Sequence, residues 1–201
     1  MANPASLTIV NVGYRSTNYW VISVGRFRLL VDIGYPGTMG TMMANLRRMD
    51  VPLQEIRYAL ATHYHLDHAW LAQEMKLAGV PLLVMENQVE AIPRQGDFAK
   101  PVDTYLEITL HDNVVIPCAE SRALLAGIGI AGEIFHTPGH SDDSVSLLLD
   151  DGSVFTGDLT PPGLACEGQA DVVNASWRLL RAHGATRVYP AHGPTRTLTG
   201  V

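Results

Sequence analysis

Four side chains of the types that bind metal ions fall within six positions of this chain: His63, His65, Asp67 and His68. Imidazole and carboxylate are the usual ligands of catalytic zinc and similar divalent metals. A continuous helix would turn His65 away from the other three, whereas a loop that leaves a strand can aim all four into one small space. The alternative is a polar turn that happens to be rich in histidine. The density of ligand types favours a metal-binding loop.

The flanking residues place this loop at the end of a strand. Residues 57–61 have the composition of a buried strand, and residues 69–78 predict a helix. Open α/β sheets bind their ligands at the carboxyl ends of strands. We therefore expect the ligand cluster at such an edge.

Three more ligand-type residues occur later, and each follows a predicted strand. His140 comes after the turn Pro138-Gly139, Asp158 comes directly after Gly157, and His192 follows residues 187–189. The sequence thus offers seven candidate metal ligands, which are His63, His65, Asp67, His68, His140, Asp158 and His192.

In this order the seven residues resemble the pattern of the metallo-β-lactamase superfamily of binuclear metallohydrolases. That pattern is His-x-His-x-Asp-His, a histidine after a Pro-Gly turn, a Gly-Asp pair and a late histidine. The resemblance covers nearly the whole chain and implies one domain over residues 1–201. It also implies a four-layer αβ/βα sandwich of two mixed β-sheets flanked by helices. Periodicity alone supports only an α/β or α+β fold.

The resemblance further implies how the ligands are divided. His63, His65 and His140 would hold one metal, Asp67, His68 and His192 the second, and Asp158 would bridge the two. Two divalent ions are expected, with zinc as the first choice and iron or manganese as alternatives. A metal-bridging hydroxide would attack the substrate, and Asp67 would act as the catalytic residue that assists proton transfer. The remaining histidines, His111, His136 and His183, are expected to be structural.

Departures from subfamily patterns narrow the substrate. Residue 158 is Asp where one major class of zinc β-lactamases carries a cysteine ligand, so β-lactamase activity is less favoured. Pro161 replaces a tyrosine that the best-known acyl-homoserine lactonases carry three residues after the bridging Asp. The resemblance implies hydrolysis of a small carboxylic ester, thioester or lactone. The alternatives are a phosphodiesterase or other phosphoester hydrolase, and a weakly active metal-binding or regulatory protein.

Composition limits the partners. The chain has 201 residues, 47% hydrophobic and 17% charged, with a formal charge of −6. Its basic residues are dispersed, so we expect a small-molecule substrate and no nucleic acid. No apolar run approaches the roughly 18 residues of a membrane span. With two cysteines and no signal-like start, cytoplasmic placement is expected. The oligomeric state is left open.

The remaining elements follow from periodicity. Methionines and a leucine recur every three or four positions between Gly37 and Asp50, which predicts an amphipathic helix with its stripe in the core rather than on a binding surface. A helix around Val173, Trp177 and Leu180 is expected to end near Gly184. Strands are predicted at 7–12, 19–24, 28–33, 81–85, 114–117, 131–135, 144–149, 153–156 and 187–189, in addition to 57–61.

Two features outside the ligand set are also candidates for the site. Asp32 closes a predicted strand, and the resemblance implies that it supports the ligand loop; capping a turn is the alternative. His68 and His140 are 72 residues apart, which suggests an insertion near residues 92–113. We expect a short helix at residues 89–92, ended by Pro93, and then a loop. This segment would form a lid over the metal site, with Phe98 and Tyr105 lining the substrate pocket, or it is a plain surface excursion.

Overall fold

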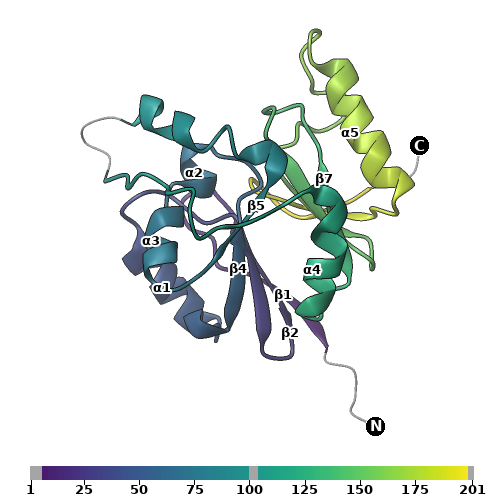
Figure 1. Cartoon of the computed structure of the whole chain (residues 1–201). Coiled ribbons are helices and arrows are strands. Elements are labelled where there is room, and N and C mark those ends of the chain that lie inside the picture. Colours follow the sequence, from purple (N-terminus) through teal and green to yellow (C-terminus); the bar gives the residue numbers. More distant parts are fainter. Residues whose placement is uncertain (1–5, 100–103, 199–201) are drawn as a thin grey trace.

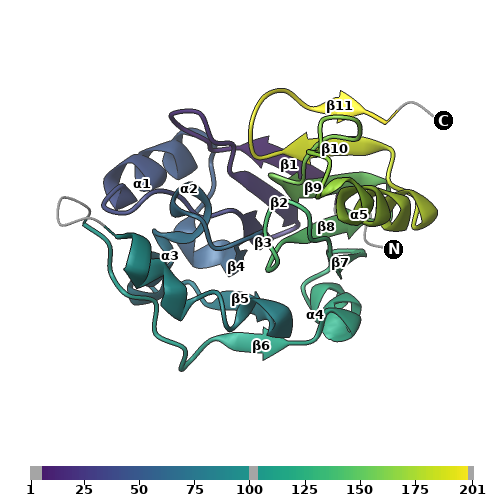
Figure 2. The same ribbon diagram turned by 90° about the horizontal axis from the view of Figure 1, so that it is seen from above.

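Two β-sheets pack face to face with helices on both outer sides (Figure 1, Figure 2). The computed structural model describes residues 6–99 and 104–198. The first sheet has the order β1-β2-β3-β4-β5-β6, and the second has the order β11-β10-β9-β8-β7. Both sheets contain parallel and antiparallel pairs, so the predicted sandwich of two mixed sheets is confirmed.

The strands match the predicted segments closely. They are β1 Leu7–Asn11, β2 Trp20–Val24, β3 Phe27–Val31, β4 Ile56–Leu60, β5 Leu82–Met85, β6 Val114–Ile116, β7 Gly132–His136, β8 Val145–Leu149, β9 Ser153–Gly157, β10 Arg187–Pro190 and β11 Arg196–Thr197. The helices are α1 Met39–Arg48, α2 Leu66–Ala69, α3 Ala72–Leu77, α4 Ser121–Gly127 and α5 Ala170–Ala182, with short 3-10 turns at Leu53–Glu55, Glu86–Gln88, Pro93–Phe98 and Cys118–Glu120. The two-residue strand β11 was not predicted.

The central strands are apolar on both faces because each face packs against another layer. Leu30 on β3 belongs to a core with Met42 and Leu46 of α1. Its neighbour Leu29 points the other way, into the core between the sheets that contains Phe155. This alternation is the period-two pattern of a strand buried on both sides. The methionine stripe of α1 lies in the core, as predicted.

The outer face of the second sheet is covered by α5. Val173, Trp177 and Leu180 are buried against Val154 of β9 and Val188 of β10. These helix positions lie three to four residues apart, the spacing that puts side chains on one face. Together, α1 to α3, the two sheets and α5 make the four layers that Figure 2 shows edge-on.

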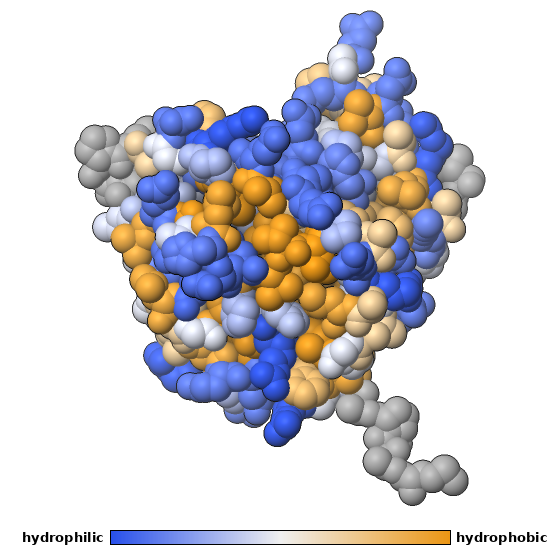
Figure 3. Space-filling model, in the orientation of Figure 1, coloured by the Kyte–Doolittle hydropathy of each residue, from blue (hydrophilic) through white to orange (hydrophobic). Residues whose placement is uncertain are grey.

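Strand direction brings the predicted site residues to one end of the molecule. β4 is parallel to β3 and β5, and β9 is parallel to β10. β7 is antiparallel to β8, which is antiparallel to β9, so β7, β9 and β10 point the same way. The ligand-type residues follow the carboxyl ends of β4, β7, β9 and β10. The surface is notched at the end of the molecule that carries α2 (Figure 3).

Two predicted helices differ from the structure. The predicted helix at 69–78 is broken, since Ala69 ends α2 and α3 begins only at Ala72. The carbonyl of His68 accepts hydrogen bonds from the N–H groups of Ile33 and Gly34, and the N–H of Leu71 donates to the carbonyl of Gly34. These bonds interrupt the helical ladder. Residues 89–92 form a turn, and the 3-10 helix begins at Pro93 instead of ending there. A proline suits the first helical position because it lacks an N–H.

The proposed lid is described in part. Residues 92–99 and 104–113 are placed, and residues 100–103 lie outside the described residues. Phe98 is 72% exposed, whereas Tyr105 packs against Trp70 with ring centroids 4.6 Å apart. Within residues 6–99 and 104–198, no helix is long and apolar enough to cross a membrane.

Candidate metal centre

The first four candidate ligands come from the loop after β4 and from α2. His63 and His65 lie in the loop, and Asp67 and His68 lie in the first turn of α2. The start of the loop is fixed by the buried side chain of Gln88, which donates hydrogen bonds to the carbonyls of Ala61 at 3.0 Å and Thr62 at 3.4 Å. On the other side, the N–H of Tyr64 donates to a carboxylate oxygen of Asp143 at 2.8 Å.

Asp32 fixes both ends of this loop. Its Oδ1 accepts hydrogen bonds from the N–H and the hydroxyl of Thr62, each at 2.8 Å. Its Oδ2 lies 3.0 Å from Nδ1 of His68, and Asp32 is 1% exposed. A carboxylate on Nδ1 leaves Nε2 of His68 facing the cluster. The predicted supporting role of Asp32 is confirmed by these contacts.

The other three candidate ligands come from the second sheet. Gly157, with φ +52°, turns the chain at the end of β9, and a Cβ there would lie 2.2 Å from the hydroxyl of Thr62. Only glycine permits this close approach, which sets Asp158 beside the β4 loop. His192 follows β10, and its Nδ1 donates to the carbonyl of Ser16 at 2.7 Å.

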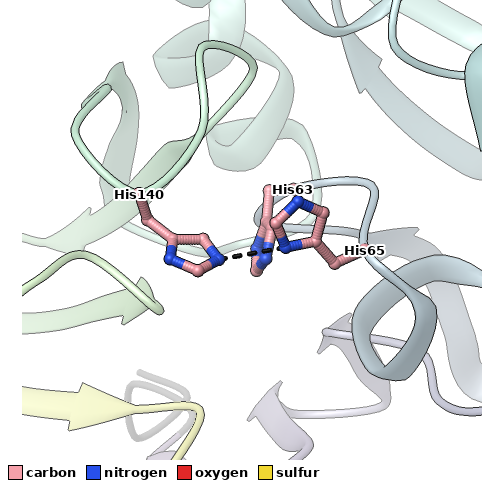
Figure 4. A group of neighbouring side chains, drawn as sticks. All are labelled: His63, His65 and His140. Carbon is pink, nitrogen blue, oxygen red and sulfur yellow. Dashed lines mark hydrogen bonds between the residues drawn. The ribbon is translucent and has the colours of Figure 1, made fainter.

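All seven predicted ligands converge on one small space. Three overlapping groups have ligand atoms within 4.8 Å of one another, namely His63–His65–His140, His63–His68–Asp158 and Asp67–His68–His192. Figure 4 shows the rings of the first group turned toward one another from two different loops, with Nε2 of His140 3.0 Å from Nδ1 of His65. The first and third groups contain the two ligand triplets that the sequence pattern implied.

Asp158 lies between these two triplets. Its Oδ2 is 3.3 Å from Nε2 of His68 and 3.6 Å from Nε2 of His140. Its Oδ1 is 3.4 Å from Nε2 of His192. One carboxylate therefore reaches histidines of both triplets, which is the position that a bridging ligand requires.

The histidines differ in their electrostatic surroundings. Burial, with a further contribution from neighbouring histidines, holds the pKa of His63 well below its usual range, and burial also lowers the pKa of His140. Burial opposes the charged form of His68 too, but the carboxylates of Asp32 and Asp158 outweigh it and raise the pKa of His68 well above its usual range. Burial would raise the pKa of Asp158, but its hydrogen bond to His68 and the nearby imidazoles hold it low.

The donor set fits divalent metal ions. Nε2 of His63 is buried and has no hydrogen-bond partner among the described residues. Leaving a buried polar nitrogen unpaired costs about 1–3 kcal/mol, and a bond to a metal would remove that cost. A neutral imidazole and an ionised carboxylate are the forms that bind metals, and the low pKa values of His63 and Asp158 favour those forms.

An apolar cavity of about 320 Å³ adjoins the cluster. It is lined by two candidate ligands and by apolar and amide side chains, which are Tyr64, His65, Leu66, Asp67, Trp70, Gln95 and Phe98. Gln95 accepts a hydrogen bond from the indole N–H of Trp70 and so ties the 3-10 helix Pro93–Phe98 to α2. Phe98 lines this cavity, whereas Tyr105, which was expected beside it, packs against Trp70 and is not part of the lining.

The three histidines expected to be structural lie outside the cluster. Nε2 of His136 is 2.7 Å from the carbonyl of Asp142, His183 stacks on Phe135, and His111 is largely exposed beside Asp112. Sequence reasoning missed Thr17 and Gln88. Thr17 donates to Oδ2 of Asp67 at 2.7 Å across 50 positions, for which the sequence offers no signal. A polar Gln88 soon after an apolar strand was a signal that could have been used.

Comparisons with known proteins bear on the family and the fold. A model of the metallo-beta-lactamase superfamily matches residues 12–192. A probable metallo-hydrolase of Methanocaldococcus jannaschii is 26% identical over 200 residues, covering 93% of this chain and 92% of that protein. An atrochrysone carboxyl ACP thioesterase of Aspergillus terreus is 27% identical over 185 residues, but this chain spans only 50% of its length.

Solved structures show the same fold. The FEZ-1 metallo-beta-lactamase from Legionella gormanii superposes with a TM-score of 0.71 at 20% identity, covering 96% of this chain and 81% of that chain. The metallo-beta-lactamase family protein TTHA1429 from Thermus thermophilus superposes with a TM-score of 0.67 at 19% identity, covering 95% and 74%. At these identities the likeness concerns the fold.

Proposed function

Because this chain belongs to the metallo-β-lactamase superfamily of hydrolases, we propose that it is a binuclear enzyme acting on a small carboxylic ester, thioester or lactone. The observation that carries the proposal is the position of Asp158, which lies within 3.6 Å of histidines from both triplets. In this arrangement His63, His65 and His140 would hold one ion, and Asp67, His68 and His192 the other, with Asp158 shared. Zinc is the expected metal.

Divalent ions at these positions would lower the pKa of water toward about 7 and polarise the oxygen under attack. The protein supplies the rest of the chemistry. Thr17 donates to Oδ2 of Asp67, and Nε2 of His192 lies 3.2 Å from the same oxygen. These contacts orient a carboxylate that also lines the apolar cavity. Asp67 is therefore suited to hold and transfer a proton to the leaving group.

The apolar cavity supports an acyl substrate. Its wall of Tyr64, Trp70 and Phe98 lies directly beside His65 and Asp67. An apolar acyl group would bury its surface there, whereas the charged phosphate of a phosphodiester would gain little binding free energy from these side chains. The thioesterase activity named for the Aspergillus terreus relative also favours an acyl substrate.

Two measurements test the proposal. Elemental analysis of gently purified protein supplied with zinc should give two ions per chain; one ion or none would contradict the binuclear assignment. The metal-loaded protein should hydrolyse members of a chromogenic panel of esters, thioesters and lactones faster than phosphodiesters, and chelation should abolish turnover. Preference for phosphodiesters would favour the phosphoesterase alternative. Two bound ions without turnover on any substrate would favour a regulatory metal site.

A further inference from the structure

Arg196 is held beside the candidate metal centre by the edge strand β11. Its backbone pairs with Val188 of β10, so both side chains lie on the sheet face that α5 covers. The guanidinium carbon lies 5.7 Å from the centre of the Trp177 ring, within the range of a cation–π contact. Trp177 is itself fixed, because its indole N–H donates to the carbonyl of Thr160 at 2.7 Å.

The charge of Arg196 is not paired with an acid. Among residues 6–99 and 104–198, Arg196 makes no ion pair and no side-chain hydrogen bond. Other arginines of the chain are paired, for example Arg28 with Glu55 and Arg122 with Asp150, each at 2.9 Å. Partial burial lowers the pKa of Arg196, and no carboxylate offsets this effect. A half-buried arginine remains charged at neutral pH.

Arg196 shares a cavity with the metal-ligand candidates. A cavity of about 290 Å³ is lined by Arg196 together with His140, Asp158 and His192. Leu159, Pro161 and Pro190 make the rest of its wall largely apolar, and Arg196 adds a guanidinium that the cavity beside His65 and Asp67 lacks. The candidate centre therefore borders two cavities, and the second also presents an arginine that has no acidic partner among the described residues.

We propose that Arg196 recognises an anionic group of the substrate, so that the preferred ester or thioester carries a carboxylate or phosphate near the bond that is hydrolysed. The inference rests on the proposed hydrolase function and narrows its substrate class. The planar guanidinium presents parallel N–H donors that match a carboxylate or a phosphate in a bidentate manner. The contact with Trp177 restricts the guanidinium before the substrate arrives, which reduces the entropy lost on binding.

The test compares matched thioesters that differ only in charge. In the first pair the leaving thiol is either 3-mercaptopropionate, which carries a carboxylate, or its neutral carboxamide. A second carries it as a phosphate, 2-mercaptoethyl phosphate against 2-mercaptoethanol. A third carries it in the acyl group, succinyl against succinamoyl. Wild-type protein should prefer the charged member of at least one pair by kcat/KM, and that pair identifies whether the anion is a carboxylate or a phosphate and which side of the bond carries it.

The variants then assign the preference to Arg196. Arg196→Gln should lower kcat/KM for the charged member by about tenfold or more, the scale of a hydrogen bond to a charged group, and leave the neutral member unchanged. Arg196→Lys should retain part of the preference, because it keeps the charge without the planar fork. Arg57→Gln is the matched control, since Arg57 also stacks on an aromatic ring, that of Phe27 at 4.9 Å, at the start of β4.

Binding measurements separate this proposal from the proposed function. Calorimetry with uncleavable amide analogues of each pair compares wild-type and Arg196→Gln protein without any turnover. Tighter binding of the charged analogue that is lost in Arg196→Gln supports the anion site even if no thioester is hydrolysed. No preference for charge in any pair, or equal losses for charged and neutral members, would overturn the assignment of Arg196.

Discussion

The candidate metal centre has a buried half and an exposed half. The side chain of His68 is 0% exposed and His63 is 1% exposed, whereas the side chains of His140 and His192 are 30% and 42% exposed. The buried half is His63 and His68, which lie after β4 and in α2 and are supported by Asp32, Thr62 and Gln88. The exposed half is His140 and His192 from loops of the second sheet, together with His65 from the loop after β4. Nδ1 of His192 donates to a backbone carbonyl, that of Ser16.

This difference separates two tasks of a catalytic metal site. Water does not reach a buried imidazole, so an orientation in which its nitrogens meet neither protein nor metal is unfavourable. A buried ligand must therefore be positioned before the metal binds. An exposed ligand can complete the coordination and still leave room for the substrate, which must approach from that side. Both proposed substrate cavities accordingly border exposed or half-buried ligands, His65 and Asp67 in one and His140 and His192 in the other.

The largest effect is expected at Asp158, which connects the two halves. Asp158→Ala would remove the carboxylate that lies between the two histidine triplets and would leave two cations with less compensating charge. We expect the second metal to bind more weakly and turnover to fall by at least about a hundredfold, the scale on which catalytic electrostatics are lost. Metal content by elemental analysis and kcat on the best panel substrate measure both effects.

Asp151 on the β8–β9 turn provides a control for this change. Asp151→Ala removes an acid from the same hairpin at its opposite end, where it caps the turn by accepting from the N–H of Ser153. It should keep both metals and near-normal turnover. Full activity and two metals in Asp158→Ala would show that the halves are not bridged by this residue.

A smaller effect is expected from a change confined to the buried half. Asp32→Asn keeps the shape of the side chain and its acceptor for Thr62, but removes the negative charge beside Nδ1 of His68. Asn also tolerates the left-handed backbone of Asp32, with φ +61°, so little strain is added. Loss of such a supporting contact typically costs about 10- to 100-fold in metal affinity or activity.

Competition with a chelator measures this affinity. A loss of the metal bound by His68 with retention of the other would locate the effect in the expected triplet. If Asp32→Asn binds both metals as tightly as wild type, the metal affinity of the buried half does not depend on the charge of Asp32. Burial alone would then position these ligands.

The two halves also differ in how far the sequence predicts them. The motif from His63 to His68 follows an apolar strand, so both its residue types and its position at a strand end could be predicted. His140, Asp158 and His192 were placed beside it through the family pattern, because contacts across 75 to 125 residues leave no local signal. Asp32 was found in the same way. Thr17 and Arg196 were missed, since their roles depend on side chains packed from distant elements.

The break between α2 and α3 shows a second limit of local reasoning. The apolar pattern of residues 69–78 is helical, but α2 ends at Ala69 and α3 covers only Ala72–Leu77. The interruption comes from hydrogen bonds to Ile33 and Gly34, which follow a strand more than 30 residues earlier. The same bonds fix the carbonyl of His68, so the unpredicted break is part of what positions a candidate ligand.

A moderate effect on substrate binding is expected on the apolar side. Phe98 lines the cavity beside His65 and is 72% exposed. Phe98→Ala should raise KM for esters with an apolar acyl group by severalfold, roughly in line with the apolar area that the ring can bury, and leave metal content intact. Leu77→Ala is a matched control, because Leu77 is 73% exposed on α3 and does not line this cavity.

Steady-state kinetics on substrates of increasing acyl length distinguish the two interpretations of the segment near Phe98. If the segment forms a wall of the site, the rise in KM should grow with the length of the acyl group. Unchanged KM and kcat for every length, with folding confirmed, would identify residues 92–99 as a surface excursion rather than part of the substrate site.

The smallest effect is expected at Tyr64, which lies between two ligand candidates without being one. Its backbone N–H donates a hydrogen bond to the carboxylate of Asp143, and its ring lines the apolar cavity. No hydrogen bond of its hydroxyl is found among the described residues. Tyr64→Phe keeps the ring and the backbone contact, so both metals should remain and kcat should stay within about twofold of wild type. Elemental analysis and kinetics check this. A loss of metal would mean that the hydroxyl, and not only the backbone, supports the buried half, because the phenol ring itself is retained in the variant.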